Sequence, residues 1–399
     1  MKVNWKTVLK KLLLVLAVVF IFGAGTFLLY LFGNFGMFPL YVTKVIPVLG
    51  VALTVALSVL CAATLNRNQK RLLWGGFACV FLICAVYVGW GAYEDSIPTV
   101  DDRQLLLWEY EPFQDGNKLV TLDTESSLKF DNPWAVRLDG ATALYPIYAA
   151  FAQAVYPESH YPYYEGSVQC GGTIDAYERL VKGEVDVIFV AGPSDAQLNM
   201  AKVAGKEFHY TPIGKEAFVF FVNSENPVTS LTVEQIRGIY SGAVKNWKEV
   251  GGKRQSIRPF QRAENSGSQT SLQRLMEGLP LMEPEKRDRI AGMGGIISEV
   301  ASYRNHSNAI GFSFRFYSTE MVKNGDIRLL ALNGVEPTKE TIRGGSYPIA
   351  SEFYAVTVSD IGAAAPQESN PDLAAFLDWV LSEQGQEIVE KTGYVSLQG

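Results

Sequence analysis

The residues best equipped for chemistry lie between positions 261 and 276, in the stretch QRAENSGSQTSLQRLM. Arg262 can donate two parallel hydrogen bonds to an oxyanion. Ser266 and Ser268 add hydroxyl groups, and Gly267 between them lets the backbone approach a ligand closely. The following TSLQRLM is a helical pattern, so the loop precedes a helix N-terminus, which favours anions. We therefore expect an anion-binding loop here; the alternative is a surface loop with one solvated arginine.

The sequence does not support catalysis by this loop. The chain contains neither the G-x-S-x-G turn of serine hydrolases nor the phosphate loop G-x-x-x-x-G-K-[ST]. Its histidines, His160, His209 and His306, are scattered without metal-ligand spacing, and Cys170 is the single cysteine of the polar part. We therefore predict a binding protein without a metal site or cofactor, and not an enzyme.

Two earlier stretches have the same order of strand, small-residue loop and helix. In RLDGATALYPIYAAF (137–151) a strand ends before Gly140, and Thr142 offers a hydroxyl beside its own N–H group and that of Ala143. In VQCGGTIDAYERLVKG (168–183) two glycines precede Thr173, which begins the helix. Each threonine is a candidate anion ligand, and an ordinary helix cap is the alternative for each.

A further candidate pair follows a buried strand. The run VDVIFVAGPSDAQ places Ser194 and Asp195 directly after that strand, at its carboxyl end. Ligands of open α/β sheets usually lie at this edge.

The elements that must position these loops alternate along the chain from Trp134 onward. Apolar, β-rich runs are separated by helical patterns, which predicts an α/β fold. The strand-like runs are WAVRL (134–138), VDVIFV (185–190), AFVFFV (217–222) and FYAVTV (353–358). A last helix is expected with Asn370 as its N-cap, Pro371 at its first position and Gly393 beyond its end.

The first 92 residues have a different character. Three apolar stretches, about 12–32, 45–65 and 72–91, contain no charged residue, and each has about the 20 residues needed to cross a bilayer. A cleaved signal peptide is the alternative for the first, but its apolar run is longer than usual for that role. We therefore expect a membrane module over residues 1–92, made of three transmembrane helices.

The charges indicate an orientation and exclude one class of partner. Residues 1–93 carry eight Lys or Arg and no acid, which leaves 27 basic against 41 acidic residues for the remainder. Four lysines precede the first span and NRNQKR (66–71) joins the second to the third, so the N-terminus should be cytoplasmic and everything after residue 93 outside. The acidic remainder should not bind nucleic acid.

The polar part resembles the phosphate-binding proteins of bacterial high-affinity phosphate ABC transporters, which are two-lobed periplasmic-type solute-binding proteins. The resemblance runs from about Arg137 to the C-terminus. It rests on LDGATALYP, GEVDVIF, LTVEQIRGIYSGAVKNWKEVGG, RAENSGSQT, NAIGFSF, YPIASEFYAVT and GYVSL. The long LTVEQIRGIYSG piece followed by R-x-E-x-SGS is specific for this family, whereas the short pieces alone are weak.

The resemblance implies two α/β lobes joined by two crossing strands, with hinge closure around the ligand. AFVFFVN (217–223) and SEFYAVTV (351–358) resemble those crossings. Lobe 1 would comprise 134–217 and 350–399, and lobe 2 would comprise 218–349. Residues 93–133 would form an extracellular linker with one or two short strands.

The resemblance also implies a phosphate-binding set. Thr142, with Ala143, matches the first loop, Thr173 falls at a serine of the second, and Arg262 with Ser266, Gly267 and Ser268 matches the family's arginine and SGT loop. Glu264 sits where the family has an aspartate behind that arginine. The family carboxylate that accepts the proton of hydrogen phosphate falls near Ser194 and Asp195, where this sequence has extra residues, so Asp195 is a candidate for that role.

Three functions follow from these observations. The first is a membrane-tethered extracytoplasmic receptor that captures inorganic phosphate and delivers it to the permease subunits of an ABC transporter. The second is a membrane-anchored sensor of phosphate or another oxyanion, although the expected cytoplasmic segments hold only about 11 and 6 residues. The third is an extracellular phosphoester hydrolase, for which a general base is missing.

Overall fold

The computed structural model describes residues 5–96, 99–101, 107–283, 302–304, 306–316, 318–319 and 326–397. The chain divides into two compact units, Met1–Ile97 and Pro98–Gly399. Part of the predicted linker (97–98 and 102–106) and part of predicted lobe 2 (284–301, 305, 317 and 320–325) lie outside the described residues.

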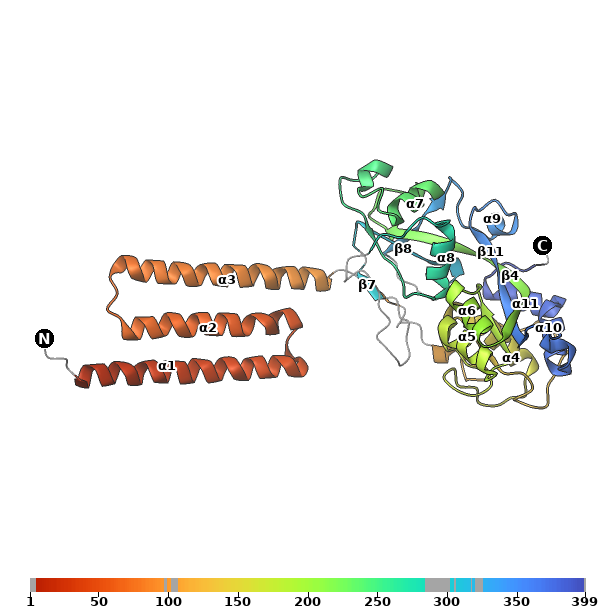
Figure 1. Cartoon of the computed structure of the whole chain (residues 1–399), viewed down its shortest axis with the longest axis horizontal. Coiled ribbons are helices and arrows are strands. Elements are labelled where there is room, and N and C mark those ends of the chain that lie inside the picture. The colour runs from red at the N-terminus through yellow and green to blue at the C-terminus, as the bar shows by residue number, and fades with distance from the viewer. Residues whose placement is uncertain are drawn as a thin grey trace. The chain divides into compact units, whose positions relative to one another are not determined.

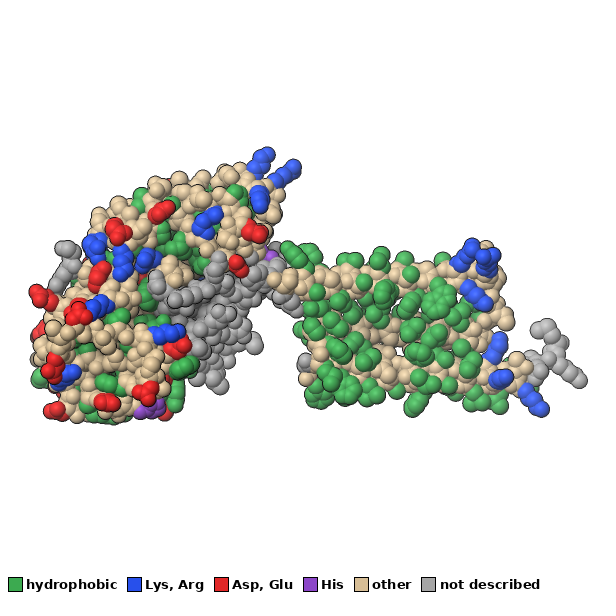
Figure 2. Space-filling model, turned by 180° about the vertical axis from the view of Figure 1, so that it is seen from behind, with side chains coloured by type: hydrophobic (Ala, Val, Ile, Leu, Met, Phe, Trp, Pro, Cys, Tyr) green, Lys and Arg blue, Asp and Glu red, His purple; other side chains and the backbone are tan. Residues whose placement is uncertain are grey.

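The first unit consists of three long helices, α1 (Trp5–Phe32), α2 (Leu40–Ala62) and α3 (Arg67–Ser96), with a π-helical turn, η1 (Gly33–Met37), after α1. Each is long and apolar enough to cross a membrane. In this unit most Lys and Arg side chains gather at one end, Lys44 near the start of α2 excepted, and hydrophobic side chains cover its flank (Figure 2). The prediction of three apolar helices before an α/β fold is confirmed.

Small residues let these helices pack closely. A Cβ atom added to Gly50 of α2 would lie 2.1 Å from the Thr26 Oγ1 atom of α1. At the basic end, Lys11 Nζ of α1 donates to the carbonyl oxygen of Ala62, the last residue of α2, at 3.1 Å. A cation there favourably meets the negative end of the α2 dipole.

The second unit is built around a mixed sheet with the strand order β2-β3-β11-β4-β8-β6, to which β9 adds by pairing with β4. β2 and β3 are parallel, as are β6 and β8, whereas β11 is antiparallel to both β3 and β4. The strands of the unit are β1 (Thr99–Asp101), β2 (Leu138–Gly140), β3 (Val187–Val190), β4 (Lys206–Asn223), β5 (Ser230–Leu231), β6 (Arg258–Pro259), β7 (Ser302–Arg304), β8 (Ala309–Phe314), β9 (Ile327–Leu329), β10 (Ala331–Leu332) and β11 (Ala350–Asp360).

Helices cover the two halves of this sheet. In Figure 1, α4, α5, α6, α10 and α11 surround one half, and α7, α8 and α9 surround the other. The helices are α4 (Tyr145–Val155), α5 (Gly172–Lys182), α6 (Asp195–Val203), α7 (Val233–Tyr240), α8 (Gly267–Leu275), α9 (Lys339–Arg343), α10 (Pro371–Leu381) and α11 (Glu383–Thr392). Short 3-10 turns are η3 (Leu107–Tyr110), η4 (Thr142–Leu144), η5 (Trp247–Val250) and η7 (Pro366–Glu368).

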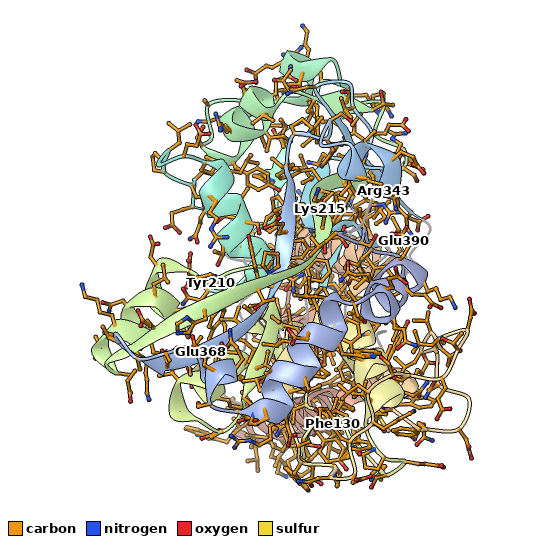
Figure 3. The ribbon with its side chains drawn as sticks, turned by 90° about the vertical axis from the view of Figure 1, so that its right-hand side faces the viewer. Phe130, Tyr210, Lys215, Arg343, Glu368 and Glu390 are labelled. Atoms are coloured by element: carbon orange, nitrogen blue, oxygen red, sulfur yellow. The ribbon has the colours of Figure 1, made fainter. Side chains whose placement is uncertain are left out.

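The long strand β4 connects the two halves. Its residues 206–217 pair with β11, and its residues 218–223 pair with β8 and β9. Figure 3 shows Tyr210 and Lys215 along this strand. Two large hydrophobic clusters flank the change of partner, one centred on α4 and α10 and the other on α7, α8 and the second half of β4. The two β-rich runs expected to be crossings, 217–223 and 351–358, therefore fall within β4 and β11.

The segment 107–133, expected as a linker, packs onto the first cluster. The N–H group of Phe130 donates to the carbonyl oxygen of Val155 in α4 at 2.7 Å. Lys391 of α11 forms an ion pair with Asp123 at 2.6 Å. Apolar side chains of this segment lie against the same core. They are spaced without a helical or strand period, so the pattern of the sequence did not reveal that they are buried.

Candidate functional site

The first two candidate loops are joined by a buried carboxylate. Asp139 of β2 is fully buried and accepts the N–H groups of Gly140 and Gly171, both at 2.7 Å. Arg179 of α5 pairs with it through Nη1 at 2.7 Å. Burial raises the pKa of Asp139, although these hydrogen bonds favour the ionised form. Asp139 therefore fixes the loop after β2 against the loop that begins α5.

In the first loop, Thr142 and Ala143 lie in the turn η4 that leads into α4. The Thr142 side chain lies close enough to the Cys170 thiol to affect its pKa, which burial raises to about 12. The carbonyl oxygen of Ala143 accepts the hydroxyl of Tyr394, a residue from beyond α11. The C-terminal segment is therefore bound to this loop by a hydrogen bond.

The third loop leads into α8, which begins at Gly267, three residues earlier than the helical pattern TSLQRLM (270–276) predicts. Ser266 is the N-cap: its Oγ accepts the N–H of Gln269 at 3.4 Å and donates to the carbonyl oxygen of Ala263 at 2.8 Å. The first N–H groups of a helix have no partner within the helix. In α8 these belong to Gly267 and to Ser268, whose side chain is buried. This N-terminus is suited to an anion.

The third loop carries one basic and one acidic residue, Arg262 and Glu264, and these two differ in burial. Arg262 is half-buried, and its backbone N–H donates to Gln269 Oε1 at 2.9 Å. Glu264 is exposed and accepts from Gln273 Nε2 at 2.8 Å. Glu264 therefore has a surface partner of its own on α8.

Ser194 and Asp195 begin α6. Ser194 is its N-cap, and its Oγ also donates to Asn265 Oδ1 in the third loop at 2.9 Å. Gln197 Nε2 donates to the carbonyl oxygen of the same Asn265 at 3.1 Å. Asp195 is exposed at the first position of the helix. The loop after β3 is thus bound to the third loop through Ser194, while Asp195 faces solvent.

A small pocket lies where these loops meet β4 and β11. Its lining consists of Ala141, Ala143, Leu144, Thr173, Ala191, Glu216, Gly267, Phe314, Ser351, Glu352, Phe353 and Tyr394. A Cβ atom added to Gly267 would lie 3.3 Å from Thr173 Oγ1, so the second and third loops touch here.

The pocket brings together Ala143, Thr173 and Gly267, one residue from each predicted loop. The other six predicted residues do not line it: Thr142, Ser194, Asp195, Arg262, Ser266 and Ser268. Thr142, Ser194 and Ser266 use their side chains in the contacts described above, and Asp195 is exposed.

Sequence reasoning missed the residues that β4, β11 and the C-terminal segment contribute. Glu216 is 5% exposed, and its carboxylate accepts the N–H groups of Ala217 at 2.8 Å and Phe316 at 3.2 Å. Burial raises its pKa to about 7. A signal was present, because Glu216 directly precedes the apolar run 217–222 that was expected to cross between lobes. Tyr394 lies in the piece GYVSL of the resemblance, but no site role was assigned to it.

No cluster of three or more His, Cys, Asp or Glu that could hold a metal ion is found among the described residues. The lining of the pocket offers a threonine hydroxyl, a serine hydroxyl, backbone N–H groups and two carboxylates. Such groups can bind a small polar ligand by hydrogen bonds.

Comparisons with known proteins found one matching family model and several similar proteins. Residues 116–384 match the family model described as a PBP superfamily domain. The phosphate-binding protein PstS of Borreliella burgdorferi is 28% identical over 193 residues, which cover 47% of this chain and 66% of that relative. The PstS protein of Pseudomonas aeruginosa is 26% identical over 258 residues, covering 59% of this chain and 76% of the relative. The chain thus spans about two thirds of the first relative's length.

Among solved structures, one neighbour is a putative phosphate ABC transporter substrate-binding protein with bound phosphate from Clostridium perfringens. It is 23% identical, covers 66% of this chain and 99% of its own, and has a TM-score of 0.48.

Proposed function

The chain belongs to the PBP superfamily, and we propose that it is a membrane-tethered, extracytoplasmic solute-binding protein that captures inorganic phosphate for an ABC importer. The name phosphate-binding protein, carried by relatives from several bacteria, supports this ligand. Binding without chemical conversion is the role we propose, with permease subunits as partners.

One observation carries the proposal: Ala143, Thr173 and Gly267 meet at one pocket, and Gly267 is the first residue of α8. A helix N-terminus directs free N–H groups and a partial positive charge at a bound anion. Threonine and serine hydroxyls add neutral donors. We propose that Arg262, Ser266 and Ser268 complete the set from the same loop, with Thr142 beside them.

We propose that 134–217 with 350–399 forms one lobe and 218–349 the other, with β4 and β11 as the connections. The change of pairing partner along β4 and the two hydrophobic clusters support this division. In this arrangement Ser194 and Asn265 belong to different lobes, so their hydrogen bond would close the mouth of the cleft.

The three apolar helices support the proposed tether. Basic residues gather at one end of the three-helix unit (Figure 2), in the first turns of α1 (Lys6, Lys10, Lys11) and of α3 (Arg67, Lys70, Arg71). Because positive segments remain cytoplasmic, the N-terminus would face the cytoplasm and the solute-binding unit the outside.

The test is calorimetric titration of the full-length chain in detergent with phosphate and with sulfate. We expect saturable phosphate binding in the micromolar range or tighter and much weaker sulfate binding. Arg262→Ala should weaken phosphate binding at least tenfold, and the matched control Arg254→Ala, at an exposed arginine, should not. Absence of phosphate binding would remove the proposed ligand, and equal sulfate binding would remove the selectivity.

A further inference from the structure

The pocket contains a carboxyl group for which the proposed function gives no role. Glu216 lies on β4 next to the point where this strand changes its partner from β11 to β8. Its side chain is 5% exposed and lines the same pocket as Thr173 and Gly267. An anion bound by the candidate loops would therefore have a buried carboxyl group as its neighbour.

Backbone groups supply the hydrogen bonds of this carboxyl group. Glu216 Oε1 accepts the N–H of Ala217 at 2.8 Å, and Oε2 accepts the N–H of Phe316 at 3.2 Å. Each oxygen therefore keeps one further position for a hydrogen bond. No salt bridge of Glu216 is found among the described residues.

The nearby cations are directed elsewhere. Arg315 and Lys339 are close enough to favour the ionised form of Glu216. Arg315 Nη1, however, donates to the carbonyl oxygen of Gly393 at 3.3 Å, and Lys339 Nζ to that of Glu390 at 3.1 Å. Their attraction is exceeded by the effect of burial, which raises the pKa of Glu216 to about 7.

The other groups facing Glu216 supply no positive charge. Tyr394 lies close enough to interact with Glu216 electrostatically, and its hydroxyl donates to the Ala143 carbonyl oxygen. Glu352 of β11 lines the same pocket, and its Oε2 accepts the Tyr354 hydroxyl at 3.4 Å. The lining thus contains two carboxylates and no basic side chain. An anion bound in it would add negative charge beside these carboxylates, because Arg262, the cation of the proposed set, does not line the pocket.

Two negative charges in contact within a buried site strongly favour protonation of one of them. We propose that the pocket binds its oxyanion together with one proton, and that this proton resides on Glu216, whose carboxyl group then donates a hydrogen bond to the anion. The proton comes from the solvent and forms the O–H bond of the carboxylic acid; no other bond is made or broken. This inference rests on the proposed oxyanion site.

The test is the pH dependence of phosphate binding, because the uptake of a proton and the binding of the anion are thermodynamically linked. When the empty pocket has an ionised Glu216, each binding event takes up one proton, so the affinity falls about tenfold per pH unit. At about pH 8.5 free phosphate is almost entirely hydrogen phosphate, so its own titration no longer contributes. Phosphate is titrated into the full-length chain in detergent at this pH, in two buffers that differ in ionisation enthalpy, and the titration is repeated up to about pH 9.5.

We expect an uptake of about one proton per phosphate and the tenfold decrease in affinity per pH unit. The Glu216→Gln variant, whose side chain is neutral at every pH, should show neither the proton uptake nor the decrease in affinity. The matched control Glu178→Gln changes an exposed glutamate of α5 and should retain both effects.

Phosphate binding to the wild-type chain without net proton uptake would overturn the inference and leave the proposed function intact. Proton uptake that persists in Glu216→Gln would equally overturn it. Absence of phosphate binding at every pH would refute both, because the oxyanion site itself would then be absent. If Glu216→Gln fails to fold, the two-buffer measurement on the wild-type chain still decides whether a proton is bound.

Discussion

The hydroxyl of Ser194 donates to the side-chain oxygen of Asn265 at 2.9 Å, across 71 positions of the chain. Gln197 adds a second hydrogen bond to the backbone of Asn265, and Arg274 of α8 donates to the carbonyl oxygen of Pro193. The loop after β3 and the loop before α8 are therefore bound directly to each other. Ser194, expected as an anion ligand, donates its hydroxyl to this contact.

This contact predicts a graded effect of substitutions at Asn265. Its φ is +67°, in the left-handed region, where alanine is strained by about 1–2 kcal/mol and glycine is not. Both Asn265→Gly and Asn265→Ala lose the hydrogen bond to Ser194, which contributes about 1 kcal/mol. In thermal melts of the full-length chain in detergent, the melting temperature should therefore decrease in the order wild type, Gly, Ala.

If this contact closes the cleft, Asn265→Gly should also release a bound anion about fivefold faster, as measured by stopped flow. An Ala variant as stable as the Gly variant would show that the backbone of Asn265 is not strained. An unchanged release rate would show that the contact does not control access to the pocket.

The ion pair of Asp139 with Arg179 predicts a large loss of stability when it is broken. Arg179→Met would leave a fully buried carboxylate without its cation, at a cost of about 3–5 kcal/mol at neutral pH. The loss should shrink at low pH, where Asp139 is protonated. Lys182→Met is the matched control, because its exposed pair with Glu178 at 3.4 Å contributes about 0–1 kcal/mol. Equal effects of the two variants in denaturant unfolding would contradict this account.

The sequence predicted the elements well where the signal was local. The three apolar helices, the α/β class and a helix behind the loop 266–268 all followed from short patterns, although that helix, α8, begins at Gly267 and not at Thr270. The C-terminal helix shows the limit of such reasoning: Asn370 caps it and Gly393 follows its end as expected, but it is divided at Ser382 into α10 and α11. A Cβ atom on Gly385 would lie 2.2 Å from the Val380 carbonyl oxygen, so the division depends on a close approach that no periodicity reveals.

Only part of the pocket lining could be predicted from the sequence, because the fold brings together segments that are distant in the chain. Thr173 and Gly267 come from loops with a recognisable strand-loop-helix pattern. Glu216, Phe353 and Tyr394 come from strands and from the C-terminal segment, and the fold alone brings them to the same place. The fold also joins distant segments elsewhere. Figure 3 labels Arg343 of α9 and Glu390 of α11, whose side chains meet at 2.7 Å although they lie 47 positions apart in the sequence.

The raised pKa of Glu216 predicts a pH-dependent stability. A carboxyl group whose pKa is about 7 when folded, but near 4.5 when unfolded, binds more protons in the folded state between these values. The protonated Glu216 carboxyl group therefore stabilises the folded state by roughly 3 kcal/mol below about pH 4.5. This stabilisation is lost as the pH rises to about 7. Glu216→Gln cannot ionise and lacks this loss.

The measurement is urea unfolding of the wild type and Glu216→Gln in detergent from about pH 4.5 to 8. The wild-type chain should lose roughly 3 kcal/mol relative to the variant over this range. Other groups titrate in both proteins, so they cancel in the difference. A difference that stays constant with pH would mean that Glu216 is already ionised in the folded protein at pH 4.5.

The close approach of Gly267 to Thr173 predicts a loss of anion affinity without a loss of stability. Gly267→Ala would place a Cβ atom 3.3 Å from Thr173 Oγ1, so that the second loop must move by a few tenths of an ångström, and the new methyl group would occupy part of the pocket. Because alanine favours the helix more than glycine does, the stability of α8 should not decrease. We expect phosphate affinity to fall at least tenfold, about 1.4 kcal/mol, in calorimetric titrations.

Gly75→Ala, in α3 where a Cβ atom meets nothing within 4 Å, is the matched control and should bind phosphate as the wild type does. Unchanged affinity in Gly267→Ala would mean that the anion does not bind at the N-terminus of α8.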